Sequence, residues 1–219
     1  EDELVFPASG DSAIAVRGST DHDHRTDYSQ YSKSGTQKTV DFVAPTSGGF
    51  NGITTVDRTG SDGYYPGDYT YDFGGTSSAT PAAAGVAALL LSKYPALTRN
   101  EVLHIMRETC DRVGDVAYTD GTHKEYGHGR VNANRALRWF HPEITGQTQD
   151  LIVEENGELT LTVDMVSVSD RDDPDGPFTV HVAAGDNYSY SGTTVYPAED
   201  FIGTLLVSVY VNDGENSSD

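Results

Sequence analysis

Residues 75–81 read Gly75-Thr76-Ser77-Ser78-Ala79-Thr80-Pro81 and lead directly into the small, apolar segment Ala82–Leu91. This composition predicts a helix from Ser77 to about Tyr94, with Pro81 near its first turn, where a missing N–H has little effect. The first N–H groups of a helix have no acceptor within the helix and can receive negative charge. A serine placed there can attack a carbonyl carbon while its own N–H helps to bind the oxyanion that forms. An ordinary serine N-cap would explain Ser77 alone but not the whole string.

The string Gly-Thr-Ser-x-Ala-x-Pro before a helix of small residues resembles the nucleophile motif of the subtilisin-like (S8-type) serine proteases. Four further segments resemble segments of the same family and follow one another in the family's order. They read Asp11-Ser12-Ala13-Ile14-Ala15-Val16, Thr26-Asp27-Tyr28-Ser29-Gln30-Tyr31, Val40-Asp41-Phe42-Val43-Ala44-Pro45 and Tyr126-Gly127-His128-Gly129-Arg130-Val131-Asn132-Ala133. Thr46 follows the third segment where the family usually has glycine. The resemblance covers about residues 5 to 140.

The first of these four segments predicts a buried strand over residues 11–16, and the second is similar to a turn of the family. Thr98-Arg99-Asn100-Glu101 predicts a capping box that opens a helix to about Thr109, and a further helix is predicted over residues 132–139.

The resemblance implies an α/β fold, in which a doubly wound, mostly parallel sheet is wrapped by helices. It implies that Ser77 forms an acyl-enzyme and that its backbone N–H supplies half of the oxyanion hole. Gly75 and Thr76 would shape the approach to this serine, and Pro81 would fix the start of the helix. The substrates would be proteins or peptides.

The partners that activate such a serine have no counterpart in this chain. A hydroxyl is a weak nucleophile and needs a base, which is itself oriented by a third group. In the subtilisin order the aspartate and the histidine precede the serine, and only 76 residues precede Ser77. The family's oxyanion-hole asparagine is also missing. We therefore predict that residues 1–141 are the C-terminal portion of a subtilisin-like peptidase domain and that this chain alone is inactive.

None of the histidines matches a histidine motif of the family. His22 and His24 alternate with Asp21 and Asp23 and lie on one side of an extended segment, which would suit a base or a metal cluster. Because the family has a surface turn at this place, we favour a solvated loop. We interpret four further histidines as structural residues; they are His104, His123, His128 and His141.

The charge distribution divides the chain near residue 142. Residues 142–219 hold 16 acidic residues and one basic residue, whereas residues 1–141 hold 18 acidic and 13 basic ones. His141-Pro142 marks the change. The net charge of −20 repels phosphate and therefore disfavours nucleic acid and anionic membranes as partners. The sequence has no membrane-spanning segment, and Cys110 is the only cysteine, so no disulfide forms within the chain.

After residue 142 the hydrophobic pattern has a period of two, which predicts an all-β, antiparallel sandwich of the cadherin or immunoglobulin type. The predicted strands are 159–163, 178–182, 193–196 and 204–211. The segments Ile144-Thr145-Gly146-Gln147, Gly185-Asp186-Asn187-Tyr188 and Val211-Asn212-Asp213-Gly214 resemble bacterial cadherin-like tandem repeats of secreted proteins. We therefore predict a cadherin-like repeat over residues 142–219, truncated at its C-terminal end.

Such repeats often bind calcium, and Ca²⁺ prefers six to eight oxygen ligands. The candidate carboxylates cluster in one loop, with others in neighbouring turns; they are Asp170, Asp172, Asp173, Glu155 and Asp213. The same Asp-rich composition is typical of a solvated turn, so both interpretations stay open.

The sequence favours a fragment of a secreted serine endopeptidase whose C-terminal repeat attaches it to a cell surface or matrix. The alternative is an extracellular adhesin or binding protein with a degenerate protease domain. The intact motif around Ser77 speaks against degeneration. An intracellular regulatory protease is disfavoured by the cadherin-like tail.

Overall fold

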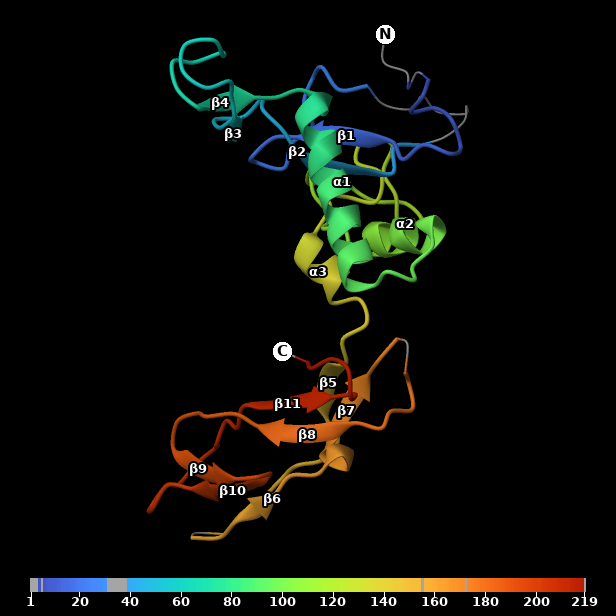
Figure 1. Cartoon of the computed structure of the whole chain (residues 1–219). Coiled ribbons are helices and arrows are strands. Elements are labelled where there is room, and N and C mark those ends of the chain that lie inside the picture. The colour runs from blue at the N-terminus through green and yellow to red at the C-terminus, as the bar shows by residue number, and fades with distance from the viewer. Residues whose placement is uncertain (1–3, 5, 31–38, 155, 172, 219) are drawn as a thin grey trace. The chain divides into compact units, whose positions relative to one another are not determined.

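The computed structural model describes residues 4, 6–30, 39–154, 156–171 and 173–218 (Figure 1). The chain folds into two compact units, Glu1–Leu137 and Arg138–Asp219. The sequence predicted a boundary between residues 141 and 142.

A parallel pair of strands forms the centre of the first unit. β1 (Val16–Ser19) lies beside β2 (Phe42–Pro45), with Val16 opposite Phe42. Segment 129–131 lies along the other side of β2, since the Val43 N–H donates to the Gly129 carbonyl at 2.8 Å. The unit therefore has the mixed strand and helix content that the sequence predicted.

The first strand begins later than the sequence predicted. The pattern indicated a strand over residues 11–16, but turns occupy residues 7–12 and β1 starts at Val16. The Ala13 N–H donates to the Gly10 carbonyl at 3.1 Å. This backbone group is therefore engaged in a local turn and not in pairing with a neighbouring strand. The turn predicted at residues 26–31 is described as far as Gln30, and Tyr31 lies outside the described residues.

The long helix α1 (Thr76–Lys93) crosses this strand pair and packs against β1, β2 and two further helices (Figure 1). Its buried stripe repeats at helical spacing along one side and consists of Ala79, Ala83, Val86 and Leu90. The predicted bounds of this helix were right to within one residue at each end.

Two shorter helices complete the first unit. α2 (Arg99–Glu108) begins with the predicted capping box, in which Thr98 and Glu101 exchange hydrogen bonds. α3 (Ala133–Leu137) is shorter than the predicted helix over residues 132–139. The hydroxyl of Tyr94, at the end of α1, donates to the carbonyl of Leu137 at 3.2 Å. This bond ties the end of α3 to the end of α1.

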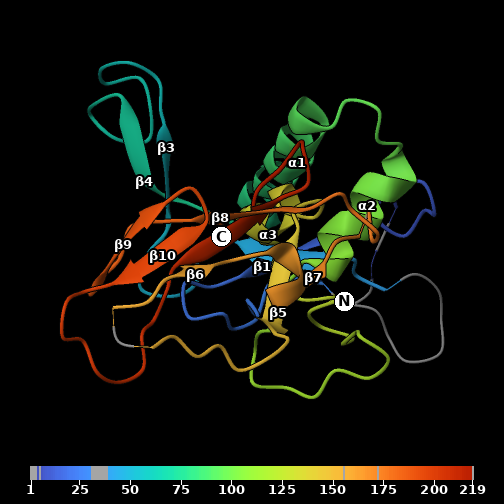
Figure 2. The ribbon, with the colours of Figure 1, turned by 90° about the horizontal axis from the view of Figure 1, so that it is seen from below.

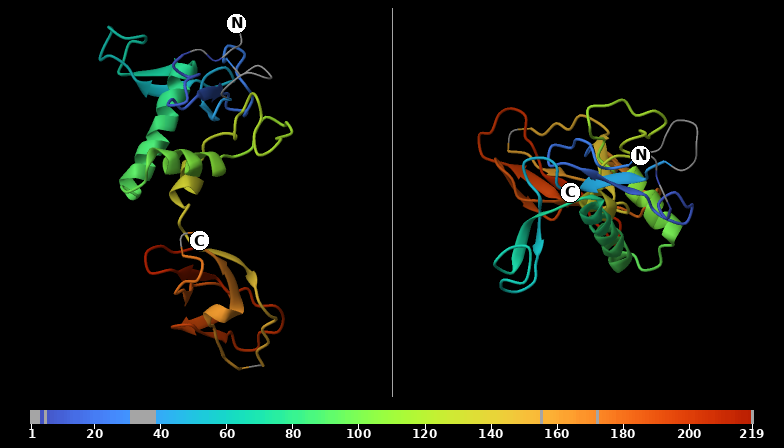
Figure 3. Two further views of the ribbon diagram at one scale, coloured as in Figure 1. Left: turned by 90° about the vertical axis from the view of Figure 1, so that its right-hand side faces the viewer. Right: turned by 90° about the horizontal axis from the view of Figure 1, so that it is seen from above.

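A hairpin leads from β2 toward α1 and extends away from the strand pair (Figures 1 and 3). β3 (Ile53–Val56) and β4 (Tyr69–Phe73) are its antiparallel strands. The Asp57 carboxylate accepts the N–H of Tyr64 at 2.6 Å and organises the connecting loop. Desolvation raises the pKa of the Asp57 carboxyl, but the backbone N–H donors around it together outweigh this effect, so its pKa lies below the ordinary value.

The second unit is all-β apart from one short 3-10 turn, Val163–Met165, among the residues described. Its strands are β5 (Glu143–Gln147), β6 (Leu159–Thr160), β7 (Val166–Ser169), β8 (Thr179–Val182), β9 (Tyr188–Ser191), β10 (Thr194–Pro197) and β11 (Val209–Asn212). They pair antiparallel as β5 with β7 and β8 with β11, while β10 lies between β6 and β9 and pairs with both (Figure 2). The buried core consists of Leu161, Val180, Val182, Val195 and Val211.

Two strands of this unit are much shorter than the sequence predicted. The predicted strand 204–211 is paired only from Val209, and β6 stops at Thr160. Alternating residues predict which face is buried, but a ladder also needs a neighbouring strand in register. The antiparallel all-β character is thus present, while the cadherin-like repeat stays a prediction.

Candidate active site

The turn before α1 adopts a backbone conformation that only glycine accommodates. Gly75 is the N-cap of the helix, with φ 75° and ψ 173°. A side chain at this position would be strained by about 1–3 kcal/mol, because this combination of angles is essentially restricted to glycine. Gly75 therefore permits the sharp turn that places Thr76 and Ser77 at the beginning of the helix.

Ser77 is the second residue of α1, and its side chain is exposed. Its N–H belongs to the first turn and so has no acceptor within the helix. The following residue, Ser78, is buried, and its N–H donates to the Gly75 carbonyl at 3.0 Å. The structure thus presents the Ser77 hydroxyl outward and the neighbouring Ser78 hydroxyl inward. An exposed hydroxyl beside first-turn amides provides a nucleophile position and a donor for an oxyanion, which are two of the parts that acyl transfer uses.

Pro81 lies deeper in the helix than the sequence predicted. It is the sixth residue of α1, inside the helix and past the first turn. A proline at this position has no N–H for the carbonyl four residues earlier, which is that of Ser77. Pro81 therefore does not fix the helix start; it leaves the carbonyl oxygen of Ser77 without its usual helical donor.

No described histidine forms a hydrogen bond with Ser77. His22 lies in a turn beside Phe50, with ring centroids 5.1 Å apart. His123 contacts the rings of Tyr118 and Tyr126. These placements agree with structural roles, so within the described residues Ser77 has no base.

A buried ion pair supports the strand that leads to the site. The Asp41 carboxylate, at the start of β2, accepts the Ala15 N–H at 2.6 Å and pairs with the Arg107 guanidinium of α2. Burial lowers the pKa of the nearby His128 imidazole, and the positive charge of Arg107 lowers it further. The folded chain therefore favours the neutral form of the His128 imidazole more than the unfolded chain does.

The single cysteine is unsuited to chemistry. Cys110 is buried, and burial together with the charge of Asp111 raises the pKa of its thiol to about 12. Since the thiolate is the reactive form, this thiol is inert near neutral pH.

The predicted calcium ligands do not assemble among the described residues. Asp172 and Glu155 lie outside the part that the structure describes. The Asp213 carboxylate accepts the N–H groups of Glu215 and Asn216, as in an ordinary turn. Elsewhere in the described ranges no three His, Cys, Asp or Glu side chains gather in a way that suits a metal ion. Asp170 is buried, and Asp173 belongs to no such group, so calcium binding by this loop stays a prediction.

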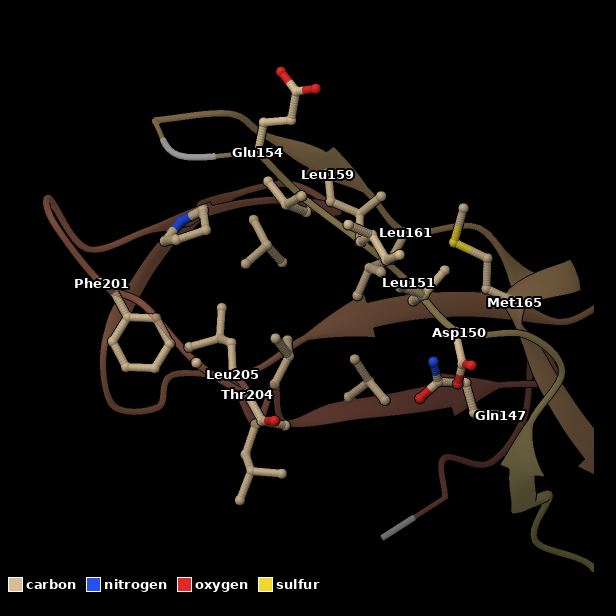
Figure 4. Close-up of a pocket in the computed structure, with 18 of the residues that line it drawn as sticks. Gln147, Asp150, Leu151, Glu154, Leu159, Leu161, Met165, Phe201, Thr204 and Leu205 are labelled. Atoms are coloured by element: carbon tan, nitrogen blue, oxygen red, sulfur yellow. The ribbon is translucent and has the colours of Figure 1, made fainter.

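A cavity of about 980 Å³ opens between the strands of the second unit (Figure 4). Aliphatic side chains such as Leu159, Leu161 and Leu205 line it, while Asp150 and Gln147 lie together at one end. None of the predicted catalytic residues lines this cavity. Its lining offers burial for an apolar group but no nucleophile paired with a base.

The subtilase family profile matches residues 1–129, which is more than half of the chain. The chain belongs to the subtilase family. The matched range contains the Ser77 string and all but the last few residues of the segments that suggested the family.

Named relatives are proteases. A "Calcium-dependent protease" of Trichormus variabilis is 41% identical over 151 residues, covering 62% of this chain and 22% of that protein. "Subtilisin DY" of Bacillus licheniformis is 29% identical over 138 residues, covering 63% of this chain and 42% of that protein. The chain thus spans less than half the length of either relative.

Solved structures agree on the fold. A crystal structure of a lanthipeptide protease has a TM-score of 0.51 at 24% identity, covering 61% of this chain and 43% of that one. A chain from the complex of the Aeromonas sobria serine protease with its chaperone has a TM-score of 0.50 at 17% identity, covering 81% of this chain and 33% of that one. Both likenesses support a subtilase-like arrangement of strands and helices.

Among the residues that the structure describes, no helix combines the length and the apolar character needed to cross a bilayer.

Proposed function

We propose that this chain is the serine-bearing part of a secreted subtilisin-like endopeptidase, in which Ser77 forms the acyl-enzyme. The observation that carries the proposal is the exposed hydroxyl of Ser77 in the first turn of α1, directly after the glycine turn at Gly75. Membership of the subtilase family and relatives named as proteases support it.

In the proposed reaction, the Ser77 Oγ attacks the carbonyl carbon of a peptide bond, and a base removes the hydroxyl proton. The carbonyl oxygen becomes an oxyanion, which the Ser77 N–H helps to bind. The C–N bond then breaks as the leaving amine receives the proton from the protonated base. Water hydrolyses the remaining ester by the same steps and restores the serine.

We propose that the base, its orienting aspartate and the oxyanion-hole asparagine are supplied by sequence upstream of residue 1. Ser77 has no histidine partner in the described part of this chain, and a serine without a base is a weak nucleophile. The 219-residue chain alone is therefore expected to be inactive, whereas the full-length protein cleaves peptides.

A serine-reactive fluorophosphonate probe tests this proposal on the full-length protein. The wild-type protein is expected to be labelled, and the Ser77→Ala variant is expected to lose the label. Ser92→Ala is the matched control, because Ser92 is an exposed serine of the same helix. A folded, mature wild-type protein that resists labelling would instead support the adhesin alternative.

We also propose that the protein acts outside the cell, that the second unit attaches it to a surface or matrix, and that it binds calcium. The acidic second unit and the relatives named calcium-dependent proteases support these proposals. Fractionation of the full-length protein tests its location. Melting curves with Ca²⁺ and with a chelator test the cation, since a ligand that binds the folded state raises the melting temperature.

A further inference from the structure

We propose that Thr46 and Ser78 are positioning residues, whose hydroxyls hold the Gly75 carbonyl and thereby orient the peptide plane in front of Ser77. This inference rests on the proposed role of Ser77 as the nucleophile. Neither residue belongs to the set that the sequence singled out for catalysis. The one signal in the sequence was Thr46 itself, which stands where glycine is usual.

The two hydroxyls meet in a buried position beneath the turn. Thr46 follows β2 and is 2% exposed, and Ser78 lies in the first turn of α1 and is 4% exposed. Their oxygens are 2.8 Å apart. The Gly75 carbonyl oxygen lies 2.7 Å from the Thr46 hydroxyl and 3.0 Å from the Ser78 hydroxyl.

The protons of these groups can satisfy every short contact at once. The Gly75 oxygen has two lone pairs, which accept the Ser78 N–H at 3.0 Å and the Thr46 O–H at 2.7 Å. The Ser78 O–H then donates to the Thr46 oxygen. The Tyr28 hydroxyl lies 3.3 Å from the Thr46 oxygen and donates its proton to the Ser47 carbonyl at 2.7 Å. Each hydroxyl thus donates once, and the Gly75 carbonyl is bound from β2 as well as from α1.

The position of Thr46 is itself tightly determined. Its N–H donates to the Ser19 carbonyl at 2.8 Å, which extends the pairing of β1 with β2. A Cβ on Gly18 would lie 2.5 Å from the Thr46 methyl carbon, so the methyl group fills the space that this glycine leaves. Thr46 therefore cannot turn away from Gly75 without losing packing. Its hydroxyl is a fixed donor.

Holding the Gly75 oxygen determines the direction of the next amide. In a trans peptide the C=O and the N–H point in opposite directions, so an inward Gly75 oxygen sends the Thr76 N–H outward. Ser77 is the residue that follows. A hydrogen bond that fixes this plane limits the orientations from which the Ser77 hydroxyl can attack, and misplaced reacting groups lose rate steeply.

Either hydroxyl can donate to the Gly75 oxygen when the other is removed, and this redundancy gives the inference a specific test. In Thr46→Val the Ser78 O–H can turn to the Gly75 oxygen, and in Ser78→Ala the Thr46 O–H remains on it. Only the double variant removes both hydroxyls. Each single substitution should therefore have a small effect, and the double substitution should have more than the combined effect of the two.

The test uses the full-length protein, with peptide kinetics and the rate of fluorophosphonate labelling as readouts. Each single variant is expected to keep kcat and the labelling rate within roughly threefold, and the double variant to lose on the order of tenfold or more in both, with KM little changed. Thr46→Ser, which keeps the hydroxyl, is expected to retain kcat.

Thr109→Val is the matched control. Thr109 is also 2% exposed, and its hydroxyl donates to the Ile105 carbonyl at 2.7 Å, but it lies at the end of α2. This variant should lose stability as Thr46→Val does and keep its kcat. The inference would be overturned if the double variant kept the kcat of the wild type. It would also be overturned if Thr109→Val lost as much kcat as the double variant. If the double variant does not fold, a loss of about tenfold or more in the labelling rate of Thr46→Val or Ser78→Ala alone would overturn it, because the remaining hydroxyl should still hold the Gly75 oxygen.

The two proposals fail in different ways. Labelling that survives Ser77→Ala would end the proposed function and with it this inference. Labelling that depends on Ser77 but not on the hydroxyl pair would end only the inference.

Discussion

The helix that presents Ser77 is anchored by one side only, and neighbouring leucines provide a test of this. Leu90 is fully buried where α1 packs on its neighbours, whereas Leu89 is 50% exposed. Leu90→Ala removes the same atoms as Leu89→Ala and changes helix propensity equally. The two substitutions therefore differ only in burial.

The expected difference follows from that burial. A buried leucine cut to alanine loses the transfer free energy of its carbons and leaves a cavity, which costs about 2.7–5 kcal/mol in the free energy of unfolding. At Leu89 the side chain is already half in water and no closed cavity forms. Its substitution should cost about 1 kcal/mol or less. The two variants should therefore differ by about 2 kcal/mol or more.

Urea unfolding of the 219-residue chain, followed by far-ultraviolet circular dichroism, measures this difference. The described α-helices all lie in the first unit, so the helical signal reports on that unit. With a urea dependence of about 1–3 kcal/mol per molar, the two midpoints should be separated by roughly 1 M. Equal midpoints for the two variants would refute the one-sided packing of α1.

Three further expectations concern single residues. Gly75→Ala should lower the free energy of unfolding by about 1–3 kcal/mol, because φ at this position is positive. The same substitution should slow fluorophosphonate labelling of the full-length protein. Labelling at the wild-type rate would contradict the strained turn. The pKa of His128 is lowered in the folded state, so the unfolded chain binds the proton first as the pH falls through about 6.5. The free energy of unfolding should thus fall on acidification, and His128→Gln should make the urea midpoint less dependent on pH. The prediction would be wrong if the variant's urea midpoint changed with pH as steeply as that of the wild type. Cys110, with a thiol pKa of about 12, should react with iodoacetamide at pH 8 only in urea, and rapid alkylation of the native chain would contradict its burial.

Local sequence patterns predicted the helix ends of the first unit well wherever the deciding residues lie within about one helical turn of one another. The capping box at Thr98 and Glu101 and the ends of α1 needed only neighbouring residues, and both are as predicted. Strand lengths were predicted less well, as at residues 204–208, because a ladder depends on a partner elsewhere in the chain. Pro81 was predicted near the first turn and lies one residue further into the helix than the predicted start implied, because the helix starts at Thr76.

The sequence alone determined the family and the helix behind Ser77, since these depend on residues close together in the chain. The tertiary structure decided which serine faces outward and which inward. It also brought Thr46 to Ser78 across 32 positions and Asp41 to Arg107 across 66. Contacts of this kind depend on how β2 and the helices pack, because burial and hydrogen-bond partners are properties of the folded chain and not of its local pattern.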